Sequence, residues 1–336
     1  MKSSRKILLT ALAALVVLLG FSYWHMIMCE GSWDGAPMEA GMGRELGEIE
    51  NVIRSDVSYL SETIGPRNPV HHASLTTARE WIVEKWTSQG YEVKSQAFLV
   101  EGKECANLEI EIPGRTRPSE IVIVSAQYDT WPESPGANNN GSGMAVLLKL
   151  SDMLKGRQLD RTLRLIAFVT QEPPYDNTES MGSLRYARRS KELGEDIRVM
   201  LSMDAIGIYK DEPGTQKIPF PFSLLYPDRG NFLAFIADLG SRSWVLKATR
   251  GFKKGSSFPI EAASVPGWVK GAAWSDHGSF WKQGYRGIQI TDTGAFRASS
   301  HTTVEDTMEK IDFSALARIT VGMYASILEL TSAEET

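Results

Sequence analysis

The chain has 336 residues, a net charge of −5 at pH 7, a hydrophobic fraction of 42 % and a charged fraction of 23 %. This composition is typical of a folded globular protein and excludes an intrinsically disordered chain. The acidic balance argues against nucleic acid as a partner, because phosphate contacts require a concentrated basic face.

Residues 1–28 carry the clearest physical signal in the sequence. Lys2, Arg5 and Lys6 precede an apolar run of roughly 20 residues, which is long enough to cross a bilayer. Acidic residues follow the run, so the charge pattern predicts a single-pass membrane protein whose body lies on the periplasmic or extracellular side. The absence of a small-x-small cleavage site favours an uncleaved anchor over a cleaved signal peptide, and both interpretations stay open.

The following segment, 29–46, is rich in Gly, Met and acidic residues and is expected to be a linker to a domain over 47–332. Apolar residues at helical spacing predict helices over 47–60 and 75–91. Strands are expected at 92–100, 106–114 and 119–129, followed by a helix at 141–154. The two cysteines, Cys29 and Cys105, do not form a disulfide framework, and we expect both to be unpaired.

The second half of the chain alternates between the two element types. We expect strands at 162–172, 197–207 and 285–293, and helices at 179–193, 232–252 and 312–331. Strands that alternate with helices predict the α/β class. The fold expected is a central, mostly parallel mixed sheet with helices on both faces, which makes a three-layer sandwich.

Polar side chains gather where the predicted strands end. Asp129, Glu172, Asp204 and His301 each lie in a loop that follows a strand. In open α/β sheets, ligands bind at the carboxyl edge of the strands. We therefore expect these four side chains to belong to one functional site.

Six short motifs occur in order along the chain. They are "QYD" at 127–129, "GANNNGSG" at 136–143, "QE" at 171–172, "SMDAIG" at 202–207, "SDHGSFW" at 275–281 and "SHTTVEDT" at 300–307. In this order the chain resembles the co-catalytic zinc aminopeptidases of metallopeptidase family 28 over residues 45–331. The stretches at 171–183 and 224–232 resemble a bacterial, membrane-anchored branch of that family. The resemblance implies a zinc-exopeptidase-like fold and peptide hydrolysis by two zinc ions.

The resemblance also implies a role for each motif residue. Its metal ligands fall at Glu172, Asp204 and His301, which match, and at Gln127 and Asn139, which replace a histidine and a bridging aspartate. Its general base falls at Gln171, which is again a substitution. Asp129 stands at the position of the carboxylate that orients the missing histidine.

These substitutions preserve shape and remove charge. A carboxamide is a weak zinc ligand and cannot bridge two cations, so we expect at most one zinc ion where the resemblance implies two. Gln171 cannot accept a proton near neutral pH. Two hypotheses follow: an aminopeptidase-like enzyme with an impaired di-zinc site, or an inactive pseudopeptidase that binds a peptide or protein. Asp276 and His277 are expected to shape the wall of the pocket, with a role as substitute base as the alternative.

Overall fold

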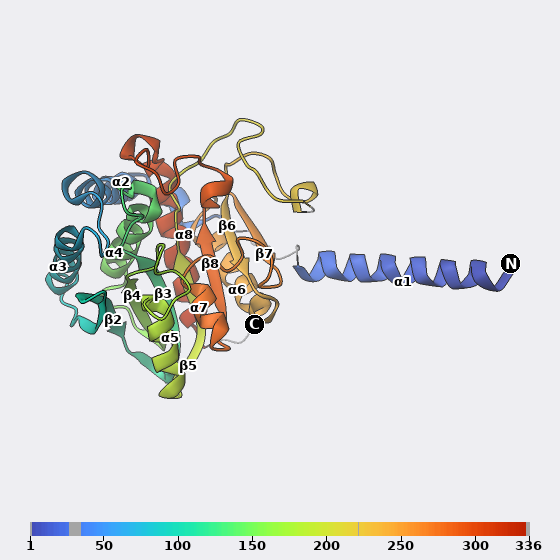
Figure 1. Ribbon diagram of the computed structural model, residues 1–336, viewed down its shortest axis with the longest axis horizontal. Coiled ribbons are helices and arrows are strands. Elements are labelled where there is room, and N and C mark those ends of the chain that lie inside the picture. The colour runs from blue at the N-terminus through green and yellow to red at the C-terminus, as the bar shows by residue number, and fades with distance from the viewer. Residues whose placement is uncertain (1, 27–34, 221, 334–336) are drawn as a thin grey trace.

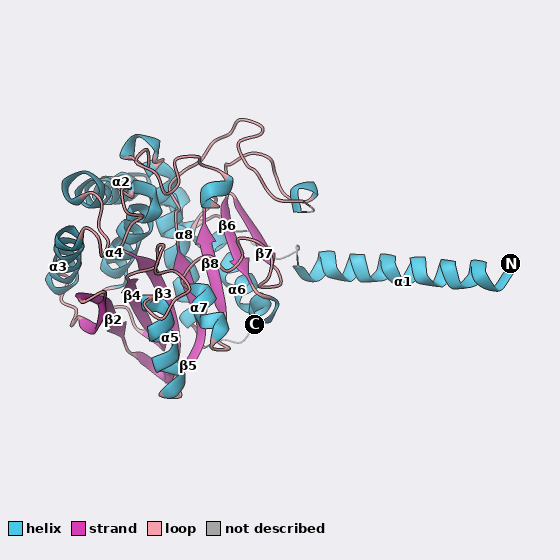
Figure 2. Cartoon of the chain, in the orientation of Figure 1, coloured by secondary structure: helices cyan, strands magenta, loops and turns pink. Residues whose placement is uncertain are grey.

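The computed structural model describes residues 2–26, 35–220 and 222–333. Its centre is one mixed sheet of eight strands in the order β1-β2-β4-β3-β5-β8-β6-β7, with helices on both faces (Figures 1 and 2). The predicted α/β class and three-layer arrangement are confirmed.

The direction of the central strands positions the site. The strands are β1 Lys94–Val100, β2 Lys103–Ile112, β3 Gly114–Gln127, β4 Leu159–Phe168, β5 Asp196–Met203, β6 Leu233–Ala237, β7 Ile260–Ser264 and β8 Gly287–Thr291. Four neighbours in the middle of the sheet, β4, β3, β5 and β8, run parallel. The flanking strands β2 and β6 run antiparallel to them. Because the four parallel strands end at one edge, the segments that follow them converge there.

Two hydrophobic cores separate the sheet from the helices on its faces. The helices are α1 Lys2–Met26, α2 Gly43–Ser58, α3 His72–Ser88, α4 Gly143–Leu154, α5 Gly182–Glu192, α6 Arg242–Gly255, α7 His277–Lys282 and α8 Phe313–Thr331. Val122 of β3 packs into the core under α2, α3, α4, α6 and α8. Its neighbour Ile123 packs with Tyr186 of α5 and Phe280 of α7, because side chains alternate along a strand. Both faces of β3 are therefore buried.

Among the residues that the structure describes, two helices are long and apolar enough to cross a membrane. The apolar window of α8 is 78 % buried inside the domain, so α8 is a core helix. The window of α1, Leu9–Met26, has none of its residues buried, and α1 leaves the domain as a single extended helix (Figure 1). Of these two, α1 therefore remains the candidate for a membrane anchor or signal segment.

The helix predicted over 232–252 is wrong. The structure has strand β6 at Leu233–Ala237, and α6 begins only at Arg242; strand β7 was not predicted. The run "FLAFIA" at 232–237 is continuously apolar, and an apolar run without alternation does not distinguish a buried strand from a buried helix.

Part of the predicted linker packs on the domain. Residues Met38–Gly41 form a 3-10 helix, and α2 begins at Gly43 rather than at residue 47. The buried carboxylate of Glu39 accepts hydrogen bonds from the Ser256 hydroxyl and the Ser257 backbone N–H, at 2.5 and 2.6 Å, and pairs with Arg318. Residues 29–34 lie outside the described residues, as does Cys29, whereas Cys105 is buried and free.

Candidate functional site

The strand ends bring most of the predicted site residues together. Gln127 is the last residue of β3 and Asp204 directly follows β5. Glu172 lies in the loop after β4, and Asn139 lies in the Asn turn, residues 137–142, which directly precedes α4. Hydrogen bonds join these four side chains, which we call the amide–carboxylate cluster.

The cluster is a chain of hydrogen bonds with a carboxylate at each end. The Gln127 amide donates from Nε2 to Asp204 Oδ1 and to Asn139 Oδ1, both at 3.2 Å. Asn139 in turn donates from Nδ2 to Glu172 Oε1 at 2.7 Å. The Asn140 side-chain amide donates from Nδ2 to Gln127 Oε1 at 2.8 Å, so the oxygen of the Gln127 amide also has a hydrogen-bond partner. The two amides at predicted metal-ligand positions thus act as hydrogen-bond donors.

Two aspartates that the sequence analysis did not single out hold the Asn turn in place. Asp306 accepts the backbone N–H groups of Asn138 and Asn139, each at 2.8 Å. Asp292, directly after β8, accepts the Asn138 amide at 2.8 Å. Asp306 lies within the quoted motif "SHTTVEDT", so its place in that motif was the signal available.

Arg67 is a third residue that the sequence analysis missed. Its guanidinium is fully buried and donates to five backbone carbonyls, those of Tyr128, Leu60, Gly65, Pro135 and Gly136, at 2.8–3.2 Å. Burial lowers the Arg67 pKa to about 10, although Asp306 and Asp129 oppose the shift. Arg67 therefore fixes the path of the chain on both sides of the loop that leads from β3 into the Asn turn.

Asp129 connects the loops after β3 and β4. Its Oδ2 accepts the backbone N–H groups of Gln171 and Glu172, at 3.0 and 3.2 Å. Burial raises the Asp129 pKa to about 6, against the effect of these two hydrogen bonds. The other oxygen, Oδ1, is buried and has no hydrogen-bond partner among the described residues. The family resemblance assigns Asp129 to orient a histidine at position 127, and Gln127 directs its hydrogen bonds elsewhere.

Burial dominates the electrostatics of the two carboxylates in the cluster. It raises the pKa of Glu172 well above its ordinary value, and the nearby Asp129 and Asp204 raise it further. Burial also raises the Asp204 pKa, while His301 and the Gln127 hydrogen bond lower it. The cluster therefore disfavours several simultaneous negative charges.

Two further predicted residues, Gln171 and His301, lie next to the cluster. Gln171 donates from Nε2 to the backbone carbonyl of Trp274 at 2.9 Å. His301 is partly buried, and its Nδ1 has no hydrogen-bond partner among the described residues. A Cβ atom at Gly294 would lie 2.9 Å from the His301 ring, so glycine is required there for the imidazole to occupy this position.

Asp276 and His277 are fully buried at the start of α7. Burial raises the Asp276 pKa well above its ordinary value and lowers the His277 pKa to about 4. His277 Nε2 lies 2.6 Å from the carbonyl oxygen of Ala272. Their role in the wall of a pocket, or as a base, stays a prediction.

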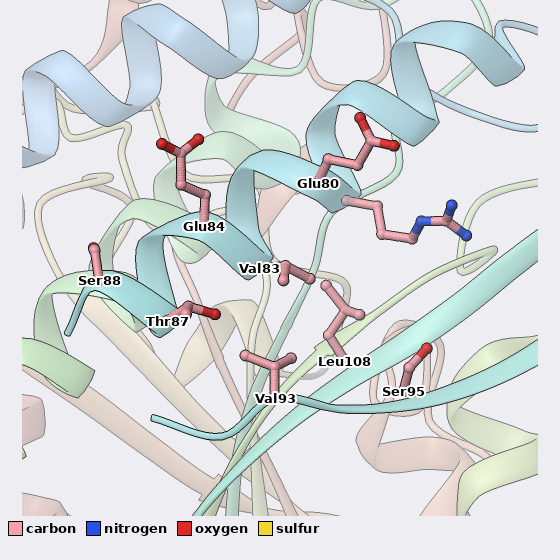
Figure 3. Close-up of a pocket in the computed structure, with 9 residues that line it drawn as sticks. Glu80, Val83, Glu84, Thr87, Ser88, Val93, Ser95 and Leu108 are labelled. Atoms are coloured by element: carbon pink, nitrogen blue, oxygen red, sulfur yellow. The ribbon is translucent and has the colours of Figure 1, made fainter. Parts of the chain in front are cut away.

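A cleft of about 740 Å³ lies away from this site, between α3, the start of β1 and Leu108 of β2 (Figure 3). Charged side chains of α3, including Glu80 and Glu84, border it, and Val83, Val93 and Leu108 form its apolar part. It contains no residue of the amide–carboxylate cluster. Within the described ranges, no group of three His, Cys, Asp or Glu side chains is placed to hold a metal ion.

Relatives with similar sequences are bacterial and eukaryotic. The uncharacterized protein YfbL of Escherichia coli is 28 % identical over 280 residues, which are 81 % of this chain and 85 % of YfbL. Aminopeptidase YwaD of Bacillus subtilis is 44 % identical over 63 residues, which are 19 % of this chain and only 14 % of YwaD.

Solved structures of low sequence identity share the fold. The zinc aminopeptidase BSAP of Bacillus subtilis has a TM-score of 0.67 at 16 % identity, covering 85 % of this chain and 96 % of BSAP. The LapA aminopeptidase of Legionella pneumophila has a TM-score of 0.68 at 15 % identity, covering 90 % of this chain and 78 % of LapA. The model of peptidase family M28 matches residues 107–327, which is more than half of the chain, and the protein therefore belongs to peptidase family M28.

Proposed function

We propose that this protein is a membrane-anchored, aminopeptidase-like M28 domain whose di-zinc site is impaired, and that it binds a peptide or protein ligand without hydrolysing it. The observation that supports this proposal is the hydrogen-bonded chain from Asp204 through Gln127 and Asn139 to Glu172. Side-chain amides donate hydrogen bonds to the Asp204 and Glu172 carboxylates, at positions that the family resemblance assigns to metal ligands.

Family membership implies zinc, and the residues present do not fit a pair of zinc ions. A bridging ligand must offer oxygen to both cations, whereas Asn139 offers an N–H group to Glu172. Gln127 likewise directs its N–H groups toward Asn139 and Asp204. Zinc sites in proteins almost always have three or four strong ligands of the His, Cys, Asp or Glu type. We therefore derive no hydrolytic step that passes through two metal ions.

The position of the general base leads to the same conclusion. A base must accept a proton in the transition state, and the neutral amide of Gln171 has no site that does so near pH 7. Its Nε2 instead donates to the Trp274 carbonyl. Without the base and the bridging ligand, the domain keeps the family fold and loses two components of the hydrolytic chemistry.

The edge of the site still offers groups to a ligand. Asp204 and His301 are partly exposed, and the Trp274 side chain is 51 % exposed and stacks on Phe296 with ring centroids 5.6 Å apart. A carboxylate together with an aromatic pair would suit a free amino group that carries an apolar side chain. We propose a peptide terminus or a protein segment of this chemistry as the ligand.

Zinc content tests the proposal. The full chain in detergent, equilibrated with micromolar zinc and then freed of excess metal, should hold well under one zinc per chain. The triple variant Gln127→His, Asn139→Asp, Gln171→Glu restores the implied ligands and base, and should hold more zinc than the wild type. Two zinc ions per wild-type chain, with chelator-sensitive cleavage of aminoacyl-nitroanilides, would contradict the proposal.

A mononuclear hydrolase is the second candidate, and the unpartnered His301 Nδ1 favours it. In that case Glu172 and His301 would supply the protein ligands, and a water would complete the site. One zinc per wild-type chain that is lost in both Glu172→Gln and His301→Gln would support this alternative. Retention of that zinc in both variants would place the metal elsewhere.

A further inference from the structure

Residues 209–232, which form most of the connection between β5 and β6, extend from the domain on the side from which α1 leaves (Figure 1). The base of the loop is fixed. The Gln216 backbone N–H donates to the Asp228 carbonyl at 2.9 Å, and the buried Gln216 side chain accepts a hydrogen bond from Arg297 at 2.9 Å. The Lys217 N–H donates to the Phe296 carbonyl at 2.8 Å. The projecting part of the loop is therefore held in a defined direction.

The projecting part, residues 217–226 without 221, exposes large apolar side chains. Phe220 is 80 % exposed, Leu224 is 75 % exposed and Leu225 is 47 % exposed. A short 3-10 helix at Phe222–Leu224 shapes this tip, and the Tyr226 hydroxyl donates to the Ala262 carbonyl of β7 at 3.1 Å. Three large apolar side chains on one projecting tip form a patch that is unusual for a surface exposed only to water.

The same side of the domain carries the end of α1. The Arg242 guanidinium lies over the Trp24 ring, 4.8 Å from its centroid, and donates to the His25 carbonyl at 2.7 Å. Strand β7, which the loop tip touches through Tyr226, also lies against α1. Trp268, in the segment after β7, is 85 % exposed. In Figure 1 the loop tip extends, along the direction of α1, about as far as the end of α1 that lies nearest the domain.

We propose that the loop tip, residues 217–220 and 222–226, inserts together with Trp268 into the interfacial layer of the membrane next to α1. This inference rests on the proposed membrane anchoring. Tryptophan and other aromatic rings are enriched at the membrane–water interface, and Trp24 and Tyr23 at the end of α1 have the same character. Apolar faces of surface elements enter the boundary between head groups and acyl chains without spanning the bilayer.

The charge of the patch indicates which lipid chemistry matters. The loop carries both signs, with Lys210, Lys217 and Arg229 against Asp211, Glu212 and Asp228, and the whole chain has a net charge of −5. Attraction to anionic lipid therefore contributes little, and the apolar side chains supply the affinity. The tip should insert into uncharged phosphatidylcholine membranes.

Attachment through both α1 and the loop tip would also fix the orientation of the domain relative to the membrane. The base of the loop contacts Thr293 and Phe296, which follow β8 at the carboxyl edge of the sheet. Insertion of the tip thus places the candidate site near the membrane surface. Its ligand would then be a segment that approaches along the membrane.

An environment-sensitive fluorophore on a single cysteine tests the inference in the full chain. With Cys29→Ser and Cys105→Ala as background, NBD is attached at Leu224→Cys and, as the matched control, at Leu99→Cys. Leu99 is 66 % exposed and lies on β1, the strand at the opposite edge of the sheet from β7. In phosphatidylcholine liposomes we expect blue-shifted, severalfold brighter emission at position 224 that lipid-borne nitroxides quench. Position 99 should emit as in water.

The outcomes separate the loop from the anchor. Water-like emission at both positions, in protein that resists alkaline extraction, would overturn the loop inference and leave the anchor intact. A blue shift at position 224 on added liposomes, in protein that alkali removes, would support the loop and contradict the anchor. A blue shift at position 224 without lipid, rising with protein concentration, would indicate contact between two copies of the chain and overturn the inference.

Discussion

Asn139 donates its side-chain amide to the carboxylate of Glu172 at 2.7 Å, and both side chains are buried. In the family pattern both positions are metal ligands, and two carboxylates this close would need a cation between them. The Asn139 amide removes that requirement, because its N–H group donates a hydrogen bond that the Glu172 carboxylate accepts. This contact can therefore hold the two side chains together with no cation between them.

Replacing Asn139 by Asp should destabilise the protein by about 3 kcal/mol near neutral pH, because the Glu172 hydrogen bond is lost and a like charge takes its place. The repulsion raises the folded-state pKa of the pair above its unfolded value, so stability is lost as pH rises through the raised pKa. The deficit should be larger at about pH 8 than at about pH 5. Urea unfolding at both pH values measures it. Asn51→Asp, on the exposed face of α2, should show almost no deficit.

The sequence pattern predicted the convergence of Asp129, Glu172 and Asp204, because residues that follow parallel strands share one edge of the sheet. The residues that hold this edge were harder to find. Arg67 donates hydrogen bonds to backbone carbonyls, and Asp292 accepts one from the side-chain amide of Asn138. Such contacts depend on where distant loops meet, and motif spacing carries no signal for them. Arg67, in the loop "IGPRNP", has no feature that marks it as buried.

The error at β6 has a different physical cause. Strand β6 lies between β8 and β7, and all but one of its five residues are buried, so alternation is absent from its sequence. Strand β7, "IEAAS", is short and rich in alanine, which has low strand propensity. Both strands depend on pairing with neighbours that are remote in sequence. Local propensity does not contain that information.

Arg67→Met should destabilise the domain by about 4 kcal/mol, because five backbone carbonyls, three of them buried and two partly buried, lose their donor. Arg67→Lys should fall between the wild type and Met, since an ammonium group has three donors and lacks the planar fork of arginine. The midpoints of thermal unfolding give the order of stability of the wild type, Arg67→Lys and Arg67→Met. Arg44→Met, at a side chain that is 91 % exposed, is the matched control and should unfold with the wild type. Equal midpoints for Arg67→Met and Arg44→Met would show that Arg67 is not needed.

The segment 1–28 should stay on the mature protein and keep it in the membrane, because no good cleavage site follows the apolar run. Expression of the full chain, followed by alkaline extraction and N-terminal sequencing, should give a membrane-bound chain that starts at or near residue 1. Added protease should degrade the domain in spheroplasts, as expected for a body outside the cytoplasm. Soluble protein that starts near residue 30 would instead identify the segment as a cleaved signal peptide.

His277 should make the stability of the protein depend on pH. Burial lowers its folded-state pKa to about 4, against about 6.5 when unfolded. Between these values the unfolded chain binds one more proton, so this contribution is present above about pH 6.5 and is lost as pH falls toward 4. Asp276 has the opposite sign: its pKa is raised, so its contribution falls as pH rises. The pH-dependent contributions of Asp276 and of every other group that both proteins share cancel in the difference between the free energies of unfolding of the wild type and His277→Gln. The free energy of unfolding of the wild type should fall relative to His277→Gln by about 3 kcal/mol between about pH 7 and pH 4. Urea unfolding at several pH values measures the difference, and parallel curves would show that His277 is not buried in its neutral form.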